Sequence, residues 1–325
     1  MTVLDRFRHL SLELSEEEAN RLATSRFDGY TVEARPPRNQ SLPATLDDFL
    51  DTITEFQTRW FGLRNTSPVY GFEIRRKHPE RLTLQYTVPS KRLERKVRTQ
   101  LPNTVPEVTL REGTTGLPVV EGSVVGGGLL TTGRPDWNPL RTDLDNPGTD
   151  SVVAALHRDV LPQSKFIIQI LFQPVAGQPV RKWIRRKRVG QKIRFLRDDK
   201  HTALSSRSAT PREKNQANEI DDKAGSPQYR TSIRFVFTDA GEWTRSRVKE
   251  LGGAFNIYSN ADTEQYLKHV TADPFRRKEL LRFFRAVADR EFRGWSRSFR
   301  SSAQELAALV ALPSRKQENL VNSHP

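Results

Sequence analysis

Two stretches of the sequence combine closely spaced arginine and lysine residues with aromatic residues. The first, VRKWIRRKRVGQKIRFLR, spans residues 180–197, and the second, RRKELLRFFRAVADREFRGWSRSFR, spans residues 276–300. A guanidinium group donates paired hydrogen bonds to phosphate or carboxylate, while its alkyl stem covers apolar surface. These residue types are therefore suited to contact with a polyanion or with an acidic partner protein.

The net charge of the chain is concentrated in these two stretches. The formal net charge is +14, yet residues 1–160 hold 21 Lys/Arg against 22 Asp/Glu. Residues 161–200 hold 11 against 2, and residues 276–300 hold 9 against 3. A second interpretation stays open, in which both stretches are solvated helices whose aromatic residues face the core. The candidate nucleic-acid contacts are Arg181, Lys182, Arg185, Arg186, Lys187, Arg188, Lys192, Arg194, Arg276, Arg277, Lys278, Arg282 and Arg285, and the candidate partner or membrane contacts are Trp183 and Ile184.

The sequence offers no recognisable catalytic constellation. It contains no cysteine, and its six histidines lack the spacing of a metal-binding pair on a helix. Glycine-rich stretches such as 113–133 are not followed by the Lys-Ser/Thr of a phosphate-binding loop, and neither a G-x-S-x-G nor an H-E-x-x-H motif occurs. The aspartates of 47–51 and 143–145 are interpreted as structural. We expect no catalytic residue, no metal, no cofactor and no small-molecule substrate, and hence no enzyme in this chain alone.

Short apolar runs exclude a membrane-spanning helix. The most apolar run, Phe166–Phe172, is far shorter than the roughly 20 residues that span a bilayer. The first residues also lack the pattern of a signal peptide. We expect a cytoplasmic protein, with peripheral attachment to the inner face of a membrane left open.

Periodicity predicts a first β-α-β-β-α-β unit. Alternating residues indicate strands, and apolar residues at helical spacing indicate helices, with Trp60 on the buried face of the first helix. Thr45 is expected to cap the first helix and Ser90 the second, and Pro106 places the last strand at a sheet edge. The predicted strands are 29–37, 69–77, 81–89 and 104–112, and the predicted helices are 42–62 and 90–101.

The same order is predicted to recur. A basic helix over 179–197, broken near Gly190, and a polar mobile loop over 198–228 interrupt the second unit between its middle strands. The C-terminal helices are 273–292 and 301–313, the latter with a capping box of Ser301 and Gln304 or of Ser302 and Glu305. The remaining strands are 118–133, 164–175, 229–240 and 265–271, and the remaining helices are 150–161 and 241–255.

These elements predict an α+β fold of tandem ferredoxin-like units with a basic insertion and C-terminal helices. The predicted divisions are an N-terminal segment 1–28, a first unit 29–115, a second unit 116–272 with the insertion 176–228, C-terminal helices 273–313 and a tail 314–325.

Four segments in this order resemble a known protein family. They are 69–108, 166–188, 232–241 and 301–313, the last carrying an E-L-A-x-L-x-x-L-P pattern from Glu305 to Pro313. Over roughly residues 30–313 the chain resembles the region that precedes the motor domain in archaeal and some bacterial conjugative DNA-transfer ATPases of the HerA–FtsK superfamily, which act in type IV secretion. The chain ends where that motor would begin, so no ATP-binding residue carries over.

The resemblance implies a truncated or split member, or a free-standing accessory domain. On this basis we expect a non-catalytic docking or assembly module whose partner is a separately encoded HerA-like ATPase. Two alternatives rest on the residues themselves. One is a stand-alone DNA-binding protein that uses both arginine-rich blocks, and the other is a peripheral membrane adaptor with Trp183 and Ile184 at the interface.

Overall fold

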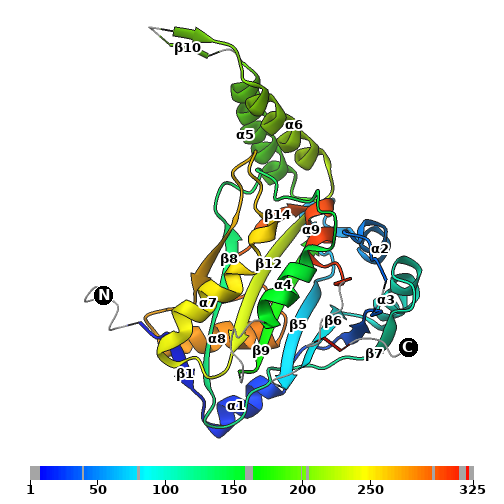
Figure 1. Cartoon of the computed structure of the whole chain (residues 1–325), viewed down its shortest axis with the longest axis vertical. Coiled ribbons are helices and arrows are strands. Elements are labelled where there is room, and N and C mark those ends of the chain that lie inside the picture. Colours follow the sequence, from blue (N-terminus) through cyan, green and yellow to red (C-terminus); the bar gives the residue numbers. More distant parts are fainter. Residues whose placement is uncertain are drawn as a thin grey trace.

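A computed structural model shows an α+β protein built on one large antiparallel sheet (Figure 1). The structure describes residues 8–38, 40–78, 81–157, 164–198, 200–202, 205–294, 297–314 and 320–321. Most of the predicted tail lies outside these residues, but Leu320 is buried and pairs with Leu82.

Ten strands of the described residues form this sheet. Its order is β1-β8-β12-β9-β5-β6-β2-β7, and β13 also pairs with β8 while β14 also pairs with β12. The short β7 lies at an edge, as Pro106 predicted. The strand bounds are β1 Ser11–Glu13, β2 Tyr30–Arg35, β5 Tyr70–His78, β6 Arg81–Val88, β7 Thr109–Glu112, β8 Val124–Thr132, β9 Phe166–Pro174, β12 Gln228–Phe237, β13 Leu267–Thr271 and β14 Phe299–Ser302.

The centre of the sheet is the antiparallel pair β5 and β9, which runs from Tyr70 opposite Phe172 to Arg76 opposite Phe166. Residues of β9 are buried on both sides, because helices cover both faces of the sheet at this point. This burial explains why the segment Phe166–Phe172 is apolar at nearly every position rather than alternating.

Side chains of β9 alternate between two apolar clusters. Phe166, Ile168 and Ile170 belong to the larger cluster, whereas Ile167 belongs to the smaller one on the opposite face. The larger cluster packs against α2 Asp47–Ile53, α3 Lys91–Thr104, α4 Gly148–His157, α7 Thr244–Gly253 and α9 Ala303–Leu309, and the smaller packs against α1 Glu16–Ala23 and α8 Arg277–Ala288.

A buried carboxylate, Glu73, lies beside the smaller cluster. Its oxygens accept hydrogen bonds from Arg75 Nη1 at 2.9 Å, Gln85 Nε2 at 2.7 Å and Gln169 Nε2 at 2.7 Å. Arg290, which follows α8, places Nε 2.9 Å and Nη2 3.1 Å from the same carboxylate. Glu73 therefore joins β5 to its neighbours β6 and β9 and to the segment that follows α8 in the sequence.

More positive than negative charge is buried here. Arg234 of β12 donates to Gln169 and, at 2.6 Å, to the carbonyl oxygen of Glu291. Burial lowers the pKa of the Arg234 guanidinium to about 9, which still leaves it protonated at neutral pH. Burial also raises the pKa of Glu73, but the charges of Arg290 and Arg75 and the bond from Gln169 outweigh it and hold that pKa at about 2. Two guanidinium groups, those of Arg75 and Arg290, thus contact the Glu73 carboxylate, and Gln169 links the third, that of Arg234, to it.

Several expectations about local structure were wrong. Helix α2 ends at Ile53 rather than reaching residue 62, and Thr45 does not cap it, since its N-cap residue Leu46 has no side-chain bond. Trp60 is consequently 74% exposed instead of buried. The basic helix continues through Gly190 without a break. The polar stretch 198–228, expected as a mobile loop, contains a strand pair and a helix.

Other local expectations were confirmed. Ser90 accepts a hydrogen bond from the backbone N–H of Leu93 at the start of α3. Of the two capping boxes considered for the last helix, the pair of Ser302 and Glu305 is the one that forms. The helix itself is shorter than predicted and ends at Leu309.

Replacing Glu73 with glutamine is expected to destabilise the protein by roughly 3–5 kcal/mol at neutral pH, because the buried guanidinium groups of Arg75 and Arg290 lose the carboxylate that they contact. The pKa of Glu73 falls from 4.5 to about 2 on folding, so its contribution is complete above pH 4.5. The contribution is lost as the pH falls from 4.5 through 2. The difference in free energy of unfolding between wild type and variant, measured with urea, should therefore shrink across this window.

Glu121→Gln provides the matched control, because Glu121 is exposed. The free energy of unfolding of this variant should differ little from that of the wild type, both at neutral pH and between pH 4.5 and 2. A Glu73→Gln variant as stable as the Glu121→Gln variant would contradict the role assigned to the buried network.

Candidate functional site

The basic helix belongs to an arm that projects from one end of the sheet (Figure 1). It is formed by α5 Pro179–Arg197, the strand pair β10 Lys200–Thr202 and β11 Ser205–Arg207, and α6 Pro211–Gly225. The two helices pack through a small core of Val189, Ile193, Leu196, Ala217 and Ile220, with Trp137 against it. This core gives the arm a defined shape although most of its surface is exposed.

Two ion pairs fasten the root of the arm to the body. Arg185 of α5 donates to Asp136 Oδ1 at 2.7 Å, and the other Asp136 oxygen accepts from the backbone N–H of Arg300 at 2.9 Å. On α6, Lys223 Nζ lies 2.8 Å from Glu305 Oε1, and both side chains are buried. Arg185 was predicted to contact nucleic acid, but the structure places it in this anchor.

Glu305 combines two structural roles. Its carboxylate caps α9 by accepting from the backbone N–H of Ser302 at 2.7 Å, and it also accepts from the N–H of Leu140 at 2.6 Å. The leucines of the E-L-A-x-L-x-x-L-P pattern, Leu306, Leu309 and Leu312, are fully buried. This pattern is therefore explained by capping and core packing within the described chain.

The cations of α5 are only partly neutralised. The helix holds nine Lys/Arg and no Asp/Glu, whereas α6 holds three and four. Arg185 pairs with Asp136, and Arg197 pairs with Asp221 at 3.2 Å. Five further cations of the helix are exposed and make no ion pair within the described part of the chain. They are Arg181, Lys182, Arg186, Lys187 and Arg188.

Three of the predicted contact residues on α5 interact with other residues of the same helix. Lys192 Nζ lies 5.4 Å from the centre of the Phe195 ring, and Lys187 Nζ lies 5.5 Å from that of Trp183. Arg194 donates a long bond to the carbonyl oxygen of Gly190 and is exposed. Trp183 and Ile184 are 62% and 40% exposed, so neither belongs to the arm's core.

The second basic block lies on a different part of the molecule. Helix α8 buries its apolar face, including Leu280, Phe283 and Phe284, against the sheet, well away from the arm (Figure 1). Arg277 pairs with Glu18 of α1, donating at 2.7 Å to Oε2. Arg276, Lys278 and Arg282 are exposed, and Arg285 is half-buried. The two blocks thus do not form one continuous surface.

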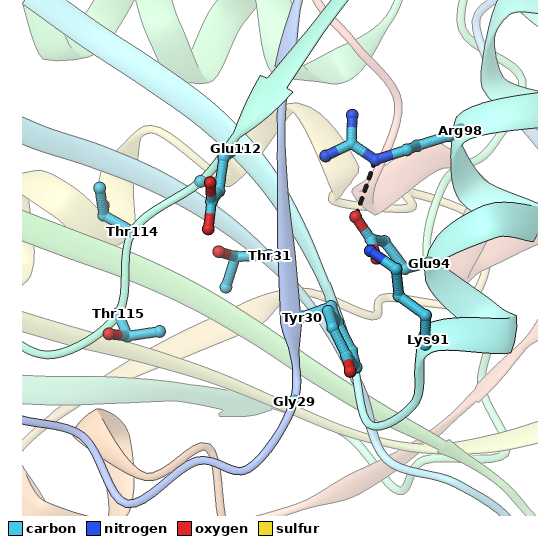
Figure 2. A pocket seen from close by; sticks show the side chains of 10 residues that line it. Gly29, Tyr30, Thr31, Lys91, Glu94, Arg98, Glu112, Thr114 and Thr115 are labelled. Carbon is cyan, nitrogen blue, oxygen red and sulfur yellow. Dashed lines mark hydrogen bonds and ion pairs between the residues drawn. The ribbon is translucent and has the colours of Figure 1, made fainter.

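An open groove lies between α3, the strand β2 and the edge strand β7 (Figure 2). Its volume is about 730 Å³. Glu94 forms ion pairs with Lys91 at 2.5 Å and Arg98 at 2.8 Å. Burial raises the pKa of Glu94, but hydrogen bonds from these two cations outweigh it, so the pKa is lowered. The groove contains paired charges and none of the predicted contact residues.

A second hollow, of 540 Å³, lies at the root of the arm and is lined by Asp143, Glu219, Asp222 and Asp262. Burial, followed by the charges of its acidic neighbours, raises the pKa of Glu219. Within the described residues, no group of three or more His, Asp or Glu could hold a metal ion. No helix of those residues is both long and apolar enough to cross a bilayer.

One exposed element escaped the sequence prediction. A short hairpin, β3 Thr58–Arg59 and β4 Arg64–Asn65, carries Trp60, Phe61 and Leu63 at its tip, next to the start of α5. The signal was Gly62 together with the turn-forming run of residues 65–68, Asn-Thr-Ser-Pro, which favours a turn over the end of a helix. Apolar residues at helical spacing obscured it.

Replacing Lys223 with alanine is expected to cost roughly 3–5 kcal/mol, because the buried Glu305 carboxylate then lacks its ion-pair partner. Urea unfolding measures this loss. Lys214→Ala is the matched control, since Lys214 is an exposed lysine on the same helix. Equal stability of the two variants would show that the pair does not anchor the arm.

No curated protein matches the sequence. A family model described as a domain of unknown function, DUF8128, matches residues 5–325. The matched range contains the sheet, the buried Glu73 network and the arm together with its anchors. The chain, arm included, therefore belongs to the DUF8128 family.

Proposed function

We propose that this protein is a non-catalytic docking module of a conjugative or type IV secretion-like DNA-transfer machine, and that its arm contacts DNA. One observation carries the proposal: α5 holds nine cations and no carboxylate, and it stands on an arm clear of the body. A projecting row of unpaired cations suits a phosphate backbone, because each contact releases condensed counterions.

The proposed architecture is two ferredoxin-like units, with the arm inserted between the middle strands of the second. The strand order supports it. The first unit would consist of β2, β5, β6 and β7, which lie in the order β7-β2-β6-β5. The second would consist of β8, β9, β12 and β13, which lie in the order β13-β8-β12-β9. When the strands are numbered within each unit, the two orders are identical, and β5 and β9 join the units.

The proposed partner is a separately encoded HerA-like ATPase, which would supply the nucleotide hydrolysis. This part rests on the resemblance over residues 30–313. The exposed Arg276, Lys278 and Arg282 of α8 lie on a surface distinct from the arm and are available for such a partner.

Replacing Arg186, Lys187 and Arg188 with alanine tests the DNA contact. The affinity of the wild type for a random duplex should fall steeply as the salt concentration rises. In the triple variant, the negative slope of log affinity against log salt should become shallower by roughly 2–3. Arg185 is left in place because it anchors the arm through Asp136.

The matched control replaces Arg276, Lys278 and Arg282 of α8, which removes the same charge elsewhere. This control should leave the salt slope close to that of the wild type. An unchanged slope in the arm variant, or an equal loss in both, would reject the arm as the DNA contact.

Association with the proposed ATPase is a separate test. Immobilised protein should retain a separately expressed HerA-like motor in at least one nucleotide state. The α8 variant should weaken this retention while the arm variant preserves it. If no nucleotide state gives association, the docking role fails even where DNA binding is intact.

A further inference from the structure

Six exposed apolar side chains, distant in sequence, gather where the hairpin β3–β4 meets the start of α5. Phe61 is 107% exposed, Trp60 74% and Trp183 62%, so most of the surface of each ring faces solvent. We call this group the apolar wedge. It consists of Trp60, Phe61, Leu63, Val180, Trp183 and Ile184.

The two parts of the apolar wedge are held together by backbone contacts. The N–H of Gln178 donates to the carbonyl oxygen of Gly62 at 2.9 Å, and Asn65 Nδ2 donates to the carbonyl oxygen of Pro174 at 2.8 Å. A Cβ atom on Gly177 would lie 2.1 Å from the Gly62 oxygen, so only glycine permits this approach. The hairpin tip is thus fixed against the root of the arm.

The hairpin holds its aromatic residues in an unfavourable backbone conformation. Trp60 has φ 57° and Phe61 has φ 52°, a left-handed region that bulky residues rarely adopt. Such residues cost roughly 1–3 kcal/mol each; the surrounding structure must impose the conformation, and they cluster at functional sites. Because both rings are exposed, burial within the protein does not offset this cost.

Cations surround the apolar wedge without local compensation. Arg59, Arg64, Arg181 and Lys182 are exposed and form no ion pair with the described part of the chain. The first turn of α5 has no acidic residue, although the positive end of the helix dipole favours one there. The surface therefore favours a negatively charged partner.

We propose that the apolar wedge inserts into the interface of an anionic lipid bilayer. Tryptophan rings settle at the level of the lipid head groups, aliphatic tips enter the acyl boundary, and Lys/Arg bind anionic head groups. A DNA phosphate backbone would satisfy the cations but would leave Leu63, Val180 and Ile184 exposed to water. This inference does not depend on DNA binding by the distal part of α5.

Flotation with phosphatidylcholine vesicles, with and without phosphatidylserine, tests the proposal. The wild type should bind the vesicles that contain phosphatidylserine and show a blue shift of tryptophan fluorescence. The variant Trp60→Ser, Phe61→Ser and Trp183→Ser should lose vesicle affinity by about tenfold or more. Because these side chains are exposed, the variant should keep the fold, and a circular dichroism spectrum like that of the wild type checks this.

The control variant, Trp243→Ser with Phe275→Ser, removes exposed aromatic residues from elsewhere on the surface and should bind like the wild type. Binding that survives loss of the apolar wedge would overturn the proposal in favour of cations alone. A folded wild type that ignores anionic vesicles would also overturn it. Loss of duplex binding in the wedge variant without any vesicle binding would assign the surface to DNA.

The two proposals fail separately. The salt slope of duplex binding depends on Arg186, Lys187 and Arg188, which the wedge variant retains. Vesicle binding with no DNA affinity would support the apolar wedge and reject the DNA-contacting arm.

Discussion

The hydrogen bonds and ion pairs of the Glu73 carboxylate join the two halves of the sheet, which meet at strands β5 and β9. Glu73 and Gln169 lie directly opposite each other on the central strands β5 and β9, and their side chains are bonded at 2.7 Å. Arg290, from the other end of the chain, completes the arrangement above them. An ion pair this deep is costly to desolvate, so its geometry and hydrogen bonds must compensate. The bond between Glu73 and Gln169 matches the register of β5 and β9, in which these two residues are opposite each other.

The basic residues are of two kinds, which differ in whether partners within the protein compensate their charge. Arginines at positions 75, 234, 277 and 290 are bound to carboxylates, carbonyls or amides of the protein itself and stabilise its fold. Five exposed cations of α5, at positions 181, 182, 186, 187 and 188, form no ion pair with the described residues. Because like charges on one helix repel each other, these five cations do not stabilise the fold, and the proposed contact with DNA would offset their repulsion. The arm's rigid anchors, Asp136 and Glu305, keep that charge in one orientation.

The positive surface has two parts, the apolar wedge and the distal part of the arm, and the neighbours of the cations differ between them. Near the body, cations mix with protruding aromatic and aliphatic side chains, whereas farther along α5 they stand mostly among polar neighbours. A scaffold for DNA transfer would need both kinds of contact if it works where DNA approaches a membrane. The fold makes the combination possible because the hairpin after α2 and the strand β9 before α5 end at the same place.

The sequence by itself determined the order of eight of the sheet strands and of the helices between them, the absence of cysteine chemistry and the location of the net charge. Periodicity and composition are local properties, so they are legible without a structure. Only the tertiary structure decided which arginines are neutralised, because the partners are remote: Arg277 and Glu18 are 259 residues apart, and Arg290 and Glu73 are 217 apart. Trp60 shows the same limit, since helical spacing predicted burial while the hairpin exposes the ring. Long-range contacts of this kind have no local signature, and they are what separate a structural arginine from a binding one.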